Sequence, residues 1–158
     1  MRRRSARTPK QRAKQLRLNR VHGAFAKHVG GQAERKFLAA WQNHKSYCQV
    51  IKKVEQASLH DDRCLKTDAM VYTSIPSHPL IRIQVKSSLL RAQKFVRGGH
   101  AIPVVWVASW DTPKSIRRNT IDAIVRMFPF LRDEFRSRGC EPPTILFNPY
   151  QVRKSQLA

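Results

Sequence analysis

Acidic side chains are scarce in this chain of 158 residues, which has ten Asp and Glu against 31 Lys and Arg and a formal net charge of +21. This excess is far beyond what solubility requires. The resulting field attracts polyanions, and phosphate contacts carry most non-specific affinity in protein–nucleic acid complexes. DNA or RNA is therefore the first candidate partner.

Long apolar runs are also missing. No stretch of the sequence approaches the roughly 20 residues of a membrane-spanning helix, so we expect no membrane partner. The arginine-rich N-terminus lacks the apolar core of a secretory signal, whereas its composition leaves a mitochondrial presequence open. We expect a cytoplasmic or nucleoid-associated protein, with mitochondrial targeting as the alternative.

Cysteine is rare and scattered, at Cys48, Cys64 and Cys140. An odd number without close pairs argues against a disulfide framework and against a zinc knuckle, and it favours a reducing compartment. The six histidines show no spacing typical of metal-ligand pairs, so we interpret them as polar surface or phosphate contacts.

The first 29 residues contain no acid and form a basic arm. Such a block cannot fold alone against its own repulsion. Leu18, Val21 and Phe25 recur at helical spacing, which predicts an amphipathic helix once the arm lies on the body or on nucleic acid. The arm residues expected to bind DNA are Arg2, Arg3, Arg4, Arg7, Lys10, Arg12, Lys14, Arg17 and Arg20.

Gly30-Gly31 is expected to break the chain between this arm and one α/β domain over residues 30–150, which a basic tail follows at 151–158. Apolar periodicity and turn residues predict the elements of the domain. Helices are expected over 32–45, 87–97, 113–127 and 128–139, strands over 46–55, 69–72, 80–86, 102–108 and 144–147, and a polar loop over 56–66.

Two of these predicted strands have informative patterns. The run 102–108 is nearly all apolar, which predicts an interior strand. In 80–86 the side chains alternate between an apolar and a polar face. The polar face holds Arg82, Gln84 and Lys86, and the apolar face holds Ile81, Ile83 and Val85.

Four polar residues of these predicted elements are candidates for a functional site. They are Glu34 in the first helix, Asp68 just before the strand 69–72, and Gln84 with Lys86 in the next strand. An acid beside a Gln-x-Lys pair across a hairpin outlines a divalent-metal site. Each residue also has an ordinary explanation. Glu34 would pair with neighbouring basic side chains or favour the helix dipole, Asp68 would cap a loop, and the strand pair would be polar surface.

A competing acidic cluster, made by His60, Asp61 and Asp62, lies in the predicted loop and has no strand lysine beside it. We interpret these three residues as surface residues.

The same polar residues carry a resemblance to the PD-(D/E)xK nuclease superfamily, and within it to archaeal-type Holliday junction resolvases and small homing-type endonucleases. The matching motifs are Gly31-Gln32-Ala33-Glu34-Arg35, Lys66-Thr67-Asp68 and Gln84-Val85-Lys86-Ser87-Ser88. The resemblance covers residues 30–108. Thr67 replaces the proline of the motif, and Gln84 replaces its usual acid, which removes one carboxylate from the metal site unless Glu34 supplies the charge.

The resemblance implies a restriction-endonuclease-like core, with a central mixed sheet flanked by helices. It also implies a metal-dependent endonuclease that acts on branched or specific duplex DNA. Asp68, Gln84 and Glu34 would hold Mg²⁺ or Mn²⁺, because these ions prefer oxygen ligands. Lys86 would orient or deprotonate the attacking water, and Ser88 would contact a phosphate.

Cutting two strands calls for two active sites, so a homodimer or a higher homo-oligomer is expected. The alternative is a non-catalytic nucleic-acid-binding protein, associated with the ribosome or the nucleoid, on a similar or degenerate fold. An enzyme needs Glu34, Asp68, Gln84 and Lys86 to converge, whereas a binding protein has no such requirement.

Overall fold

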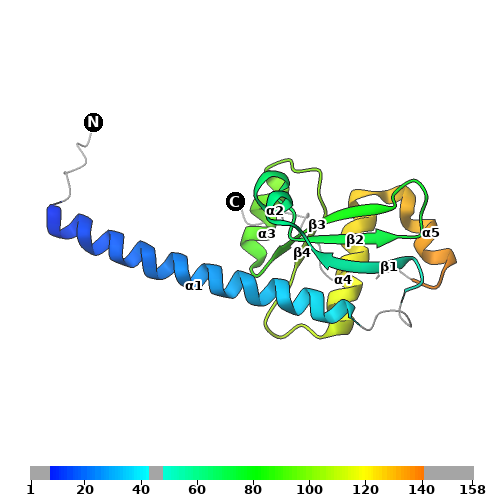
Figure 1. Ribbon diagram of the computed structural model, residues 1–158, viewed down its shortest axis with the longest axis horizontal. Coiled ribbons are helices and arrows are strands. Elements are labelled where there is room, and N and C mark those ends of the chain that lie inside the picture. The colour runs from blue at the N-terminus through cyan, green and yellow to red at the C-terminus, as the bar shows by residue number, and fades with distance from the viewer. Residues whose placement is uncertain (1–7, 43–47, 141–158) are drawn as a thin grey trace, which may run out of the picture.

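One long helix dominates the shape of the molecule and extends away from its body (Figure 1). The computed structural model describes residues 8–42 and 48–140, and α1 runs through the first of these segments, from Pro9 to Trp41. Thr8 caps the helix: its hydroxyl accepts a hydrogen bond from the Gln11 N–H (3.4 Å), and the Gln11 side chain accepts one from the Thr8 N–H (2.9 Å). Proline at the first helical position strengthens this start.

The expected break at Gly30-Gly31 is wrong, because α1 passes through both glycines without interruption. Glycine costs a helix only about 1 kcal/mol per residue relative to alanine, and the following turns bury Phe37 and Trp41 in the core. Packing therefore outweighs the local penalty. The basic arm and the body share one helix, which ends at Trp41 instead of continuing to residue 45.

In the part of the chain that the structure describes, the body is built on a four-stranded mixed sheet in the order β1-β2-β3-β4. β1 (Ile51–Gln56) pairs antiparallel with β2 (Ala69–Thr73), which pairs antiparallel with β3 (Leu80–Lys86). β4 (Val104–Trp106) runs parallel to β3. The predicted α/β class, with a mixed sheet and flanking helices, is confirmed at this level, and β2 and β3 form the predicted hairpin.

Helices surround this sheet. α2 (Leu59–Leu65) lies between β1 and β2 in the chain, and α3 (Leu89–Arg97) connects β3 to β4. α4 (Pro113–Met127) packs against α1 and β4, and a 3-10 turn, η1 (Pro129–Leu131), leads from it into α5 (Arg132–Ser137). The bounds of α4 are those that the sequence predicts.

Two further expectations about these elements are corrected. α2 lies in the segment 56–66, where the sequence predicts a loop; it has no buried residue, so it lacks the apolar periodicity by which helices are recognised. β4 stands at the end of the sheet order within the described residues, not in the interior. Its apolar character is explained by α3 and α4, which both pack against it. The predicted strand 144–147 and the tail 151–158 lie outside the described residues.

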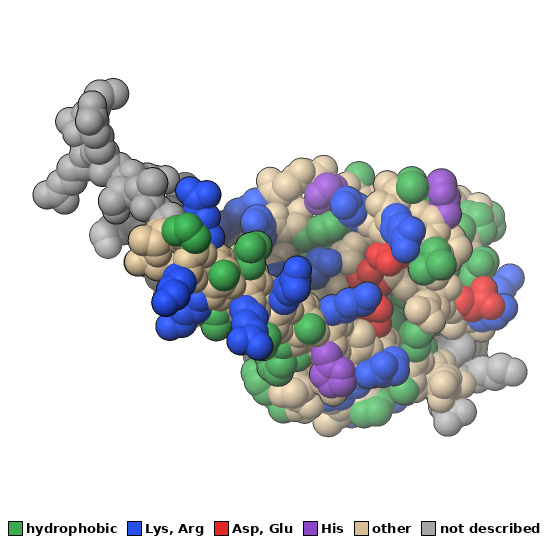
Figure 2. All heavy atoms as spheres, turned by 60° about the vertical axis from the view of Figure 1, so that its left-hand side comes forward, with side chains coloured by type: hydrophobic (Ala, Val, Ile, Leu, Met, Phe, Trp, Pro, Cys, Tyr) green, Lys and Arg blue, Asp and Glu red, His purple; other side chains and the backbone are tan. Residues whose placement is uncertain are grey.

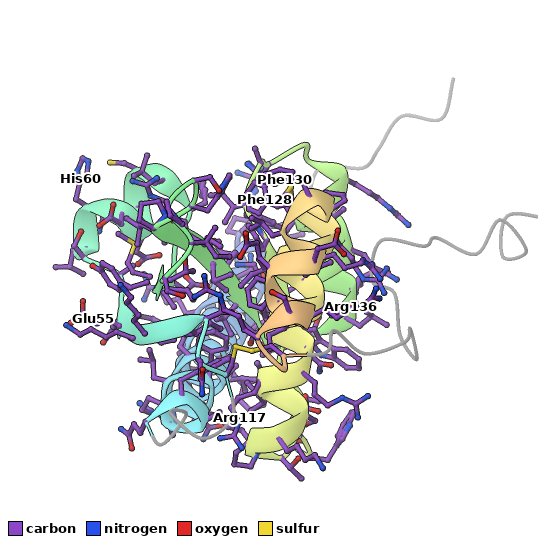
Figure 3. All side chains as sticks on the ribbon, turned by 90° about the vertical axis from the view of Figure 1, so that its right-hand side faces the viewer. Glu55, His60, Arg117, Phe128, Phe130 and Arg136 are labelled. Atoms are coloured by element: carbon purple, nitrogen blue, oxygen red, sulfur yellow. A yellow bond between two sulfur atoms is a disulfide. The ribbon has the colours of Figure 1, made fainter. Side chains whose placement is uncertain are left out.

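A disulfide joins Cys48, shortly before β1, to Cys140, which follows α5. Their Cα atoms are 5.5 Å apart although 92 positions separate them in the sequence, and the bond is visible in yellow in Figure 3. The scattered spacing that argued against a disulfide framework therefore did not exclude this single cross-link, because folding brings distant segments together. Cys64 is a free, exposed thiol on α2.

None of the helices in the described segments combines the length and apolar character that crossing a membrane would require.

Candidate functional site

The four polar residues singled out in the sequence line one hollow of about 840 Å³. Glu34 comes from α1, Asp68 from the residue before β2, and Gln84 and Lys86 from β3. Basic and imidazole side chains complete much of the wall: Lys27, Lys66, Arg91, Lys94 and His100. Figure 2 shows acidic side chains gathered beside Lys and Arg on the face that α1 crosses.

Asp68 is fixed at this hollow through its main chain and its side chain. Its N–H donates to the Ile83 carbonyl (2.9 Å), and its own carbonyl accepts from the Ala57 N–H (3.0 Å). Its Oδ2 accepts hydrogen bonds from the Val85 N–H (2.7 Å) and from Nε2 of Gln84. These contacts hold the Asp68 carboxylate in one orientation at the hollow.

The chain reaches Asp68 through a left-handed turn at Lys66, where φ is +54°. This conformation costs a non-glycine residue roughly 1–2 kcal/mol, so the neighbouring residues must hold it. Thr67 does so: it is fully buried, its N–H donates to the Asp61 carbonyl (3.1 Å), and its hydroxyl donates to the Leu65 carbonyl (3.2 Å). The threonine that replaces the motif proline thus anchors the turn before Asp68.

The polar face of β3 is less open than its sequence suggests. The apolar side chains of the strand are buried as predicted: Ile81, Ile83 and Val85. Gln84 is buried too, with 4% of its surface exposed, and Lys86 is half-buried. Gln84 donates its amide N–H to Asp68. In this structure Gln84 therefore positions the carboxylate through its amide nitrogen, and its predicted role as an oxygen ligand stays a prediction.

Burial raises the pKa of both carboxyl groups at the hollow. For Glu34, desolvation is the largest cause, and the negative charges of Asp68 and Asp62 raise the pKa further. For Asp68, desolvation outweighs the hydrogen bond from Val85 and the attraction of nearby Lys86. Two carboxylates that repel each other in a partly buried place form an environment that a cation would relieve.

Lys86 experiences the opposite shift. Burial lowers the pKa of its ammonium group, although the negative charges of Asp68 and Glu34 oppose this effect. Its Nζ lies 5.4 Å from the centre of the Phe95 ring on α3. Three ionisable groups with shifted pKa values around one hollow are typical of a functional site.

Asp62 is exposed, as the sequence predicts, but it does not lie in a loop, and its position at the hollow was not predicted. Asp62 belongs to α2 and lies on the wall of the hollow with the other two acids. Asp61 instead helps to start the helix: its N–H donates to the Ser58 hydroxyl (3.1 Å), and that hydroxyl donates to its carboxylate (2.6 Å). His60 points away from the body (Figure 3). The Ser58-x-x-Asp61 spacing is the signal that could have predicted this helix.

The residues expected to contact DNA lie in two places. The arm residues from Lys10 to Arg20 are exposed along α1, ahead of the hollow (Figure 2). Arg2, Arg3, Arg4 and Arg7 lie outside the described residues. Ser88 caps α3, since its hydroxyl accepts a hydrogen bond from the Arg91 N–H (3.2 Å). A phosphate contact by Ser88 stays a prediction.

Within residues 8–42 and 48–140, no three His, Cys, Asp or Glu side chains form a group that could hold a metal ion by themselves. Comparison of the chain with protein-family models, with curated proteins and with solved structures gives no match. The function of the hollow therefore has to follow from its own chemistry.

Proposed function

We propose that this protein is a metal-dependent DNA endonuclease with a restriction-endonuclease-like core. One observation carries the proposal: Glu34, Asp68, Gln84 and Lys86, from three separate parts of the chain, meet around one hollow with a basic wall. Their order along the chain and their element types match those implied by the nuclease resemblance. Scattered surface residues would have no reason to converge.

The donor set fits Mg²⁺ or Mn²⁺. Mg²⁺ usually keeps several waters and is bound by one or two carboxylates together with substrate phosphates, so two carboxylates are enough. Asp68 and Glu34 would hold the ion, and the raised pKa of each reflects an unrelieved cost of ionisation that positive charge would remove. The bound ion would supply charge beside the scissile phosphate and activate water for hydrolysis.

Lys86 contributes in two ways. Its lowered pKa means that more of the amine is deprotonated near neutral pH than in an exposed lysine, which suits a group that orients or deprotonates the attacking water. When protonated, it stabilises negative charge that develops on the phosphate. Gln84 supports these steps by keeping the Asp68 carboxylate in one orientation.

The exposed part of α1 guides DNA to this hollow. Over residues 9–29 the helix is roughly 30 Å long, which is close to one turn of a B-form duplex. It presents Lys10, Arg12, Lys14, Arg17, Arg20 and Lys27 without any acid. Phosphate contacts along this surface would bind all sequences alike.

A non-catalytic DNA-binding protein is the second candidate, and one observation favours it. Gln84 stands where a nuclease of this type usually has an acid, and its amide nitrogen faces Asp68. A site that has lost catalysis would keep the basic surface and the fold but would not cleave in any metal.

The deciding experiment measures cleavage and binding of a four-way junction and of a linear duplex in Mg²⁺ and Mn²⁺. We expect the wild type to cleave, and Asp68→Ala to abolish cleavage while DNA affinity survives. Removing the carboxylate also leaves two buried N–H groups unpaired, so the folded state of this variant is checked by circular dichroism. Lys86→Met, which keeps the apolar stem, should lower the cleavage rate by about 10²–10⁴-fold.

Glu55→Ala is the matched control, because Glu55 is an acid on β1 that pairs with Lys53 and lies at the edge of the body (Figure 3). It should cleave like the wild type. Binding without cleavage by the wild type in both metals would support the second candidate, and unchanged cleavage by Asp68→Ala would exclude this hollow as the active site.

A further inference from the structure

A second hollow, of about 590 Å³, lies on the neighbouring face of α1 and shares Ser87 with the first. The first hollow is lined by acids and bases, whereas the second is mostly apolar and has no acid on its wall. Its most distinctive residues are Trp106 and Trp110, whose rings meet edge to face with centres 6.2 Å apart. Its volume is within the range typical of small-molecule pockets.

Trp106 stands directly beside the candidate catalytic lysine. In the parallel ladder between β3 and β4, Trp106 pairs with Lys86, so both side chains project from the same face of the sheet. The next residue, Val107, donates its N–H to the Lys86 carbonyl (2.8 Å). A group held against Trp106 would therefore lie one strand away from the group that acts on the phosphate.

Trp110 is 76% exposed, yet the loop that carries it is held firmly. The Lys36 ammonium group on α1 donates to the carbonyls of Ala108 (3.2 Å) and Ser109 (2.6 Å). From the other side, the Ala108 N–H donates to the Asp111 carboxylate (2.7 Å). The indole is thus presented to solvent on a fixed loop, which is the arrangement expected of a stacking surface.

We infer that the Trp106–Trp110 hollow binds an unpaired nucleobase of the DNA strand whose phosphate lies at the candidate site; this rests on the proposed function. Every base has a flat π-face that stacks on tryptophan, and aromatic side chains in basic grooves are the usual platform for unpaired bases. The polyanionic backbone would follow the basic wall of the first hollow, while its base turns into the apolar one. The preferred substrate is then DNA with an unpaired nucleotide next to the cut.

The test measures binding without added metal, so that no cleavage occurs, on three DNAs. They are a blunt duplex, the same duplex with a single-stranded extension, and the same extension built of abasic nucleotides. We expect the wild type to bind the extended duplex most tightly. The abasic form should bind more weakly than the extended duplex, because it adds phosphates but no base that can stack. Trp110→Ala should lower affinity for the extended duplex by about 5- to 150-fold and change the other two little.

Two variants serve as controls. Trp110→Phe keeps a stacking ring and should retain most of the preference. Phe130→Ala removes a similarly exposed aromatic ring (63%) that lines neither hollow, and it should bind all three DNAs like the wild type. In the wild type, tryptophan fluorescence should be quenched by the extended duplex and not by the abasic one.

Equal affinities of Trp110→Ala and wild type for the extended duplex would overturn the inference. So would an equal loss on all three DNAs, which would indicate a phosphate contact, or a changed oligomeric state with unchanged binding, which would assign the hollow to a second copy of the chain. None of these results depends on cleavage, so the proposal of base binding and the proposal of nuclease activity can be refuted independently.

Discussion

The two parts of α1 have the same backbone and opposite surroundings. The outer part, residues 9–29, is basic and mostly exposed where its side chains are described, and even its apolar residues Leu18, Val21 and Phe25 stay 44–69% exposed. The inner part, residues 30–41, buries Phe37 completely and brings Glu34 to the hollow. A continuous helix can therefore belong to the core at one end and be exposed to solvent at the other, and the difference lies in packing.

The largest effect is expected when a phenylalanine is removed from each part of α1. Phe37→Ala should lower the free energy of unfolding by about 3–5 kcal/mol, because it empties a buried ring from the core. Phe25→Ala should change it by less than about 0.5 kcal/mol, since this ring contributes little to packing. Denaturant titrations of both variants measure the difference. Similar losses would mean that the outer part is packed in solution.

The second prediction concerns charge. Arg17→Gln combined with Arg20→Gln should reduce the slope of log affinity against log salt by about 0.9 for each phosphate that the variant no longer neutralises. The weakening should be equal on branched and linear DNA. Arg132→Gln with Arg136→Gln is the matched control, because α5 lies at the opposite end of the molecule (Figure 1). An unchanged slope in the α1 variant would remove the outer part from the DNA interface.

Substitution is a cleaner experiment here than deletion of residues 1–29. Because α1 is continuous, deletion would start the helix at Gly30 and leave the first N–H groups of the inner part without helical partners. Glu34 would then lie within the first turns of a frayed end. A loss of cleavage after deletion would not separate the two parts.

The third prediction separates stability from function in the inner part. Folding raises the pKa of Glu34, so the folded protein binds this proton more tightly than the unfolded chain. The ionised carboxylate therefore destabilises the metal-free fold, an effect that grows as the pH rises from the unfolded pKa to the folded one and persists above it. Glu34→Gln should unfold at a higher temperature than the wild type at neutral pH while losing cleavage.

The advantage of Glu34→Gln should disappear below the ordinary glutamate pKa of 4.5, where the wild-type carboxyl is protonated in both states. Thermal unfolding of both proteins at neutral pH and at a pH below 4.5 checks this prediction. A stability gain that is the same at both would mean that the charge of Glu34 is not its cause.

Local patterns predicted the β2–β3 hairpin and α4 well, because alternation and capping signals within these segments agree with their packing. The wrong predictions have one cause: they concern contacts between segments that lie far apart in the sequence. Local preference predicts a break at Gly30-Gly31, but burial of Phe37 and Trp41 extends the helix through it. Asp62 joins the site only because α2 folds over the hollow.

In the candidate site, too, some features follow from the local sequence and others depend on contacts between distant segments. Glu34, Asp68 and Lys86 could be named because their residue types and order resemble those of a nuclease motif. The hydrogen bond from Gln84 to Asp68 and the position of Trp106 beside Lys86 depend on strand register, which one sequence does not reveal. The disulfide between Cys48 and Cys140 has the same origin.

The smallest predicted effect lies at the boundary of the two parts. Gly30→Ala or Gly31→Ala should each stabilise the fold by about 0.5–1 kcal/mol, because beyond the adjoining helix backbone an added methyl group meets no atom within 4 Å. Gly23→Ala, in equally open space, should raise helicity without moving the global unfolding transition, since the outer part does not pack. Circular dichroism and denaturant titration measure the two effects. Equal stabilisation of the whole fold by all three glycine-to-alanine variants would contradict the difference between the packed inner part and the exposed outer part of α1.

The glycine pair also has a mechanical consequence. A helix that leaves a packed body behaves as a cantilever, and it bends most easily where side chains are absent. With an outer part roughly 30 Å long, a bend of about 10° at Gly30-Gly31 displaces the tip by about 5 Å. Glu34 lies about one turn on the body side of this joint. In the proposed DNA complex, such a bend would let the arm follow DNA of different curvature while the Glu34 carboxylate keeps its place at the hollow.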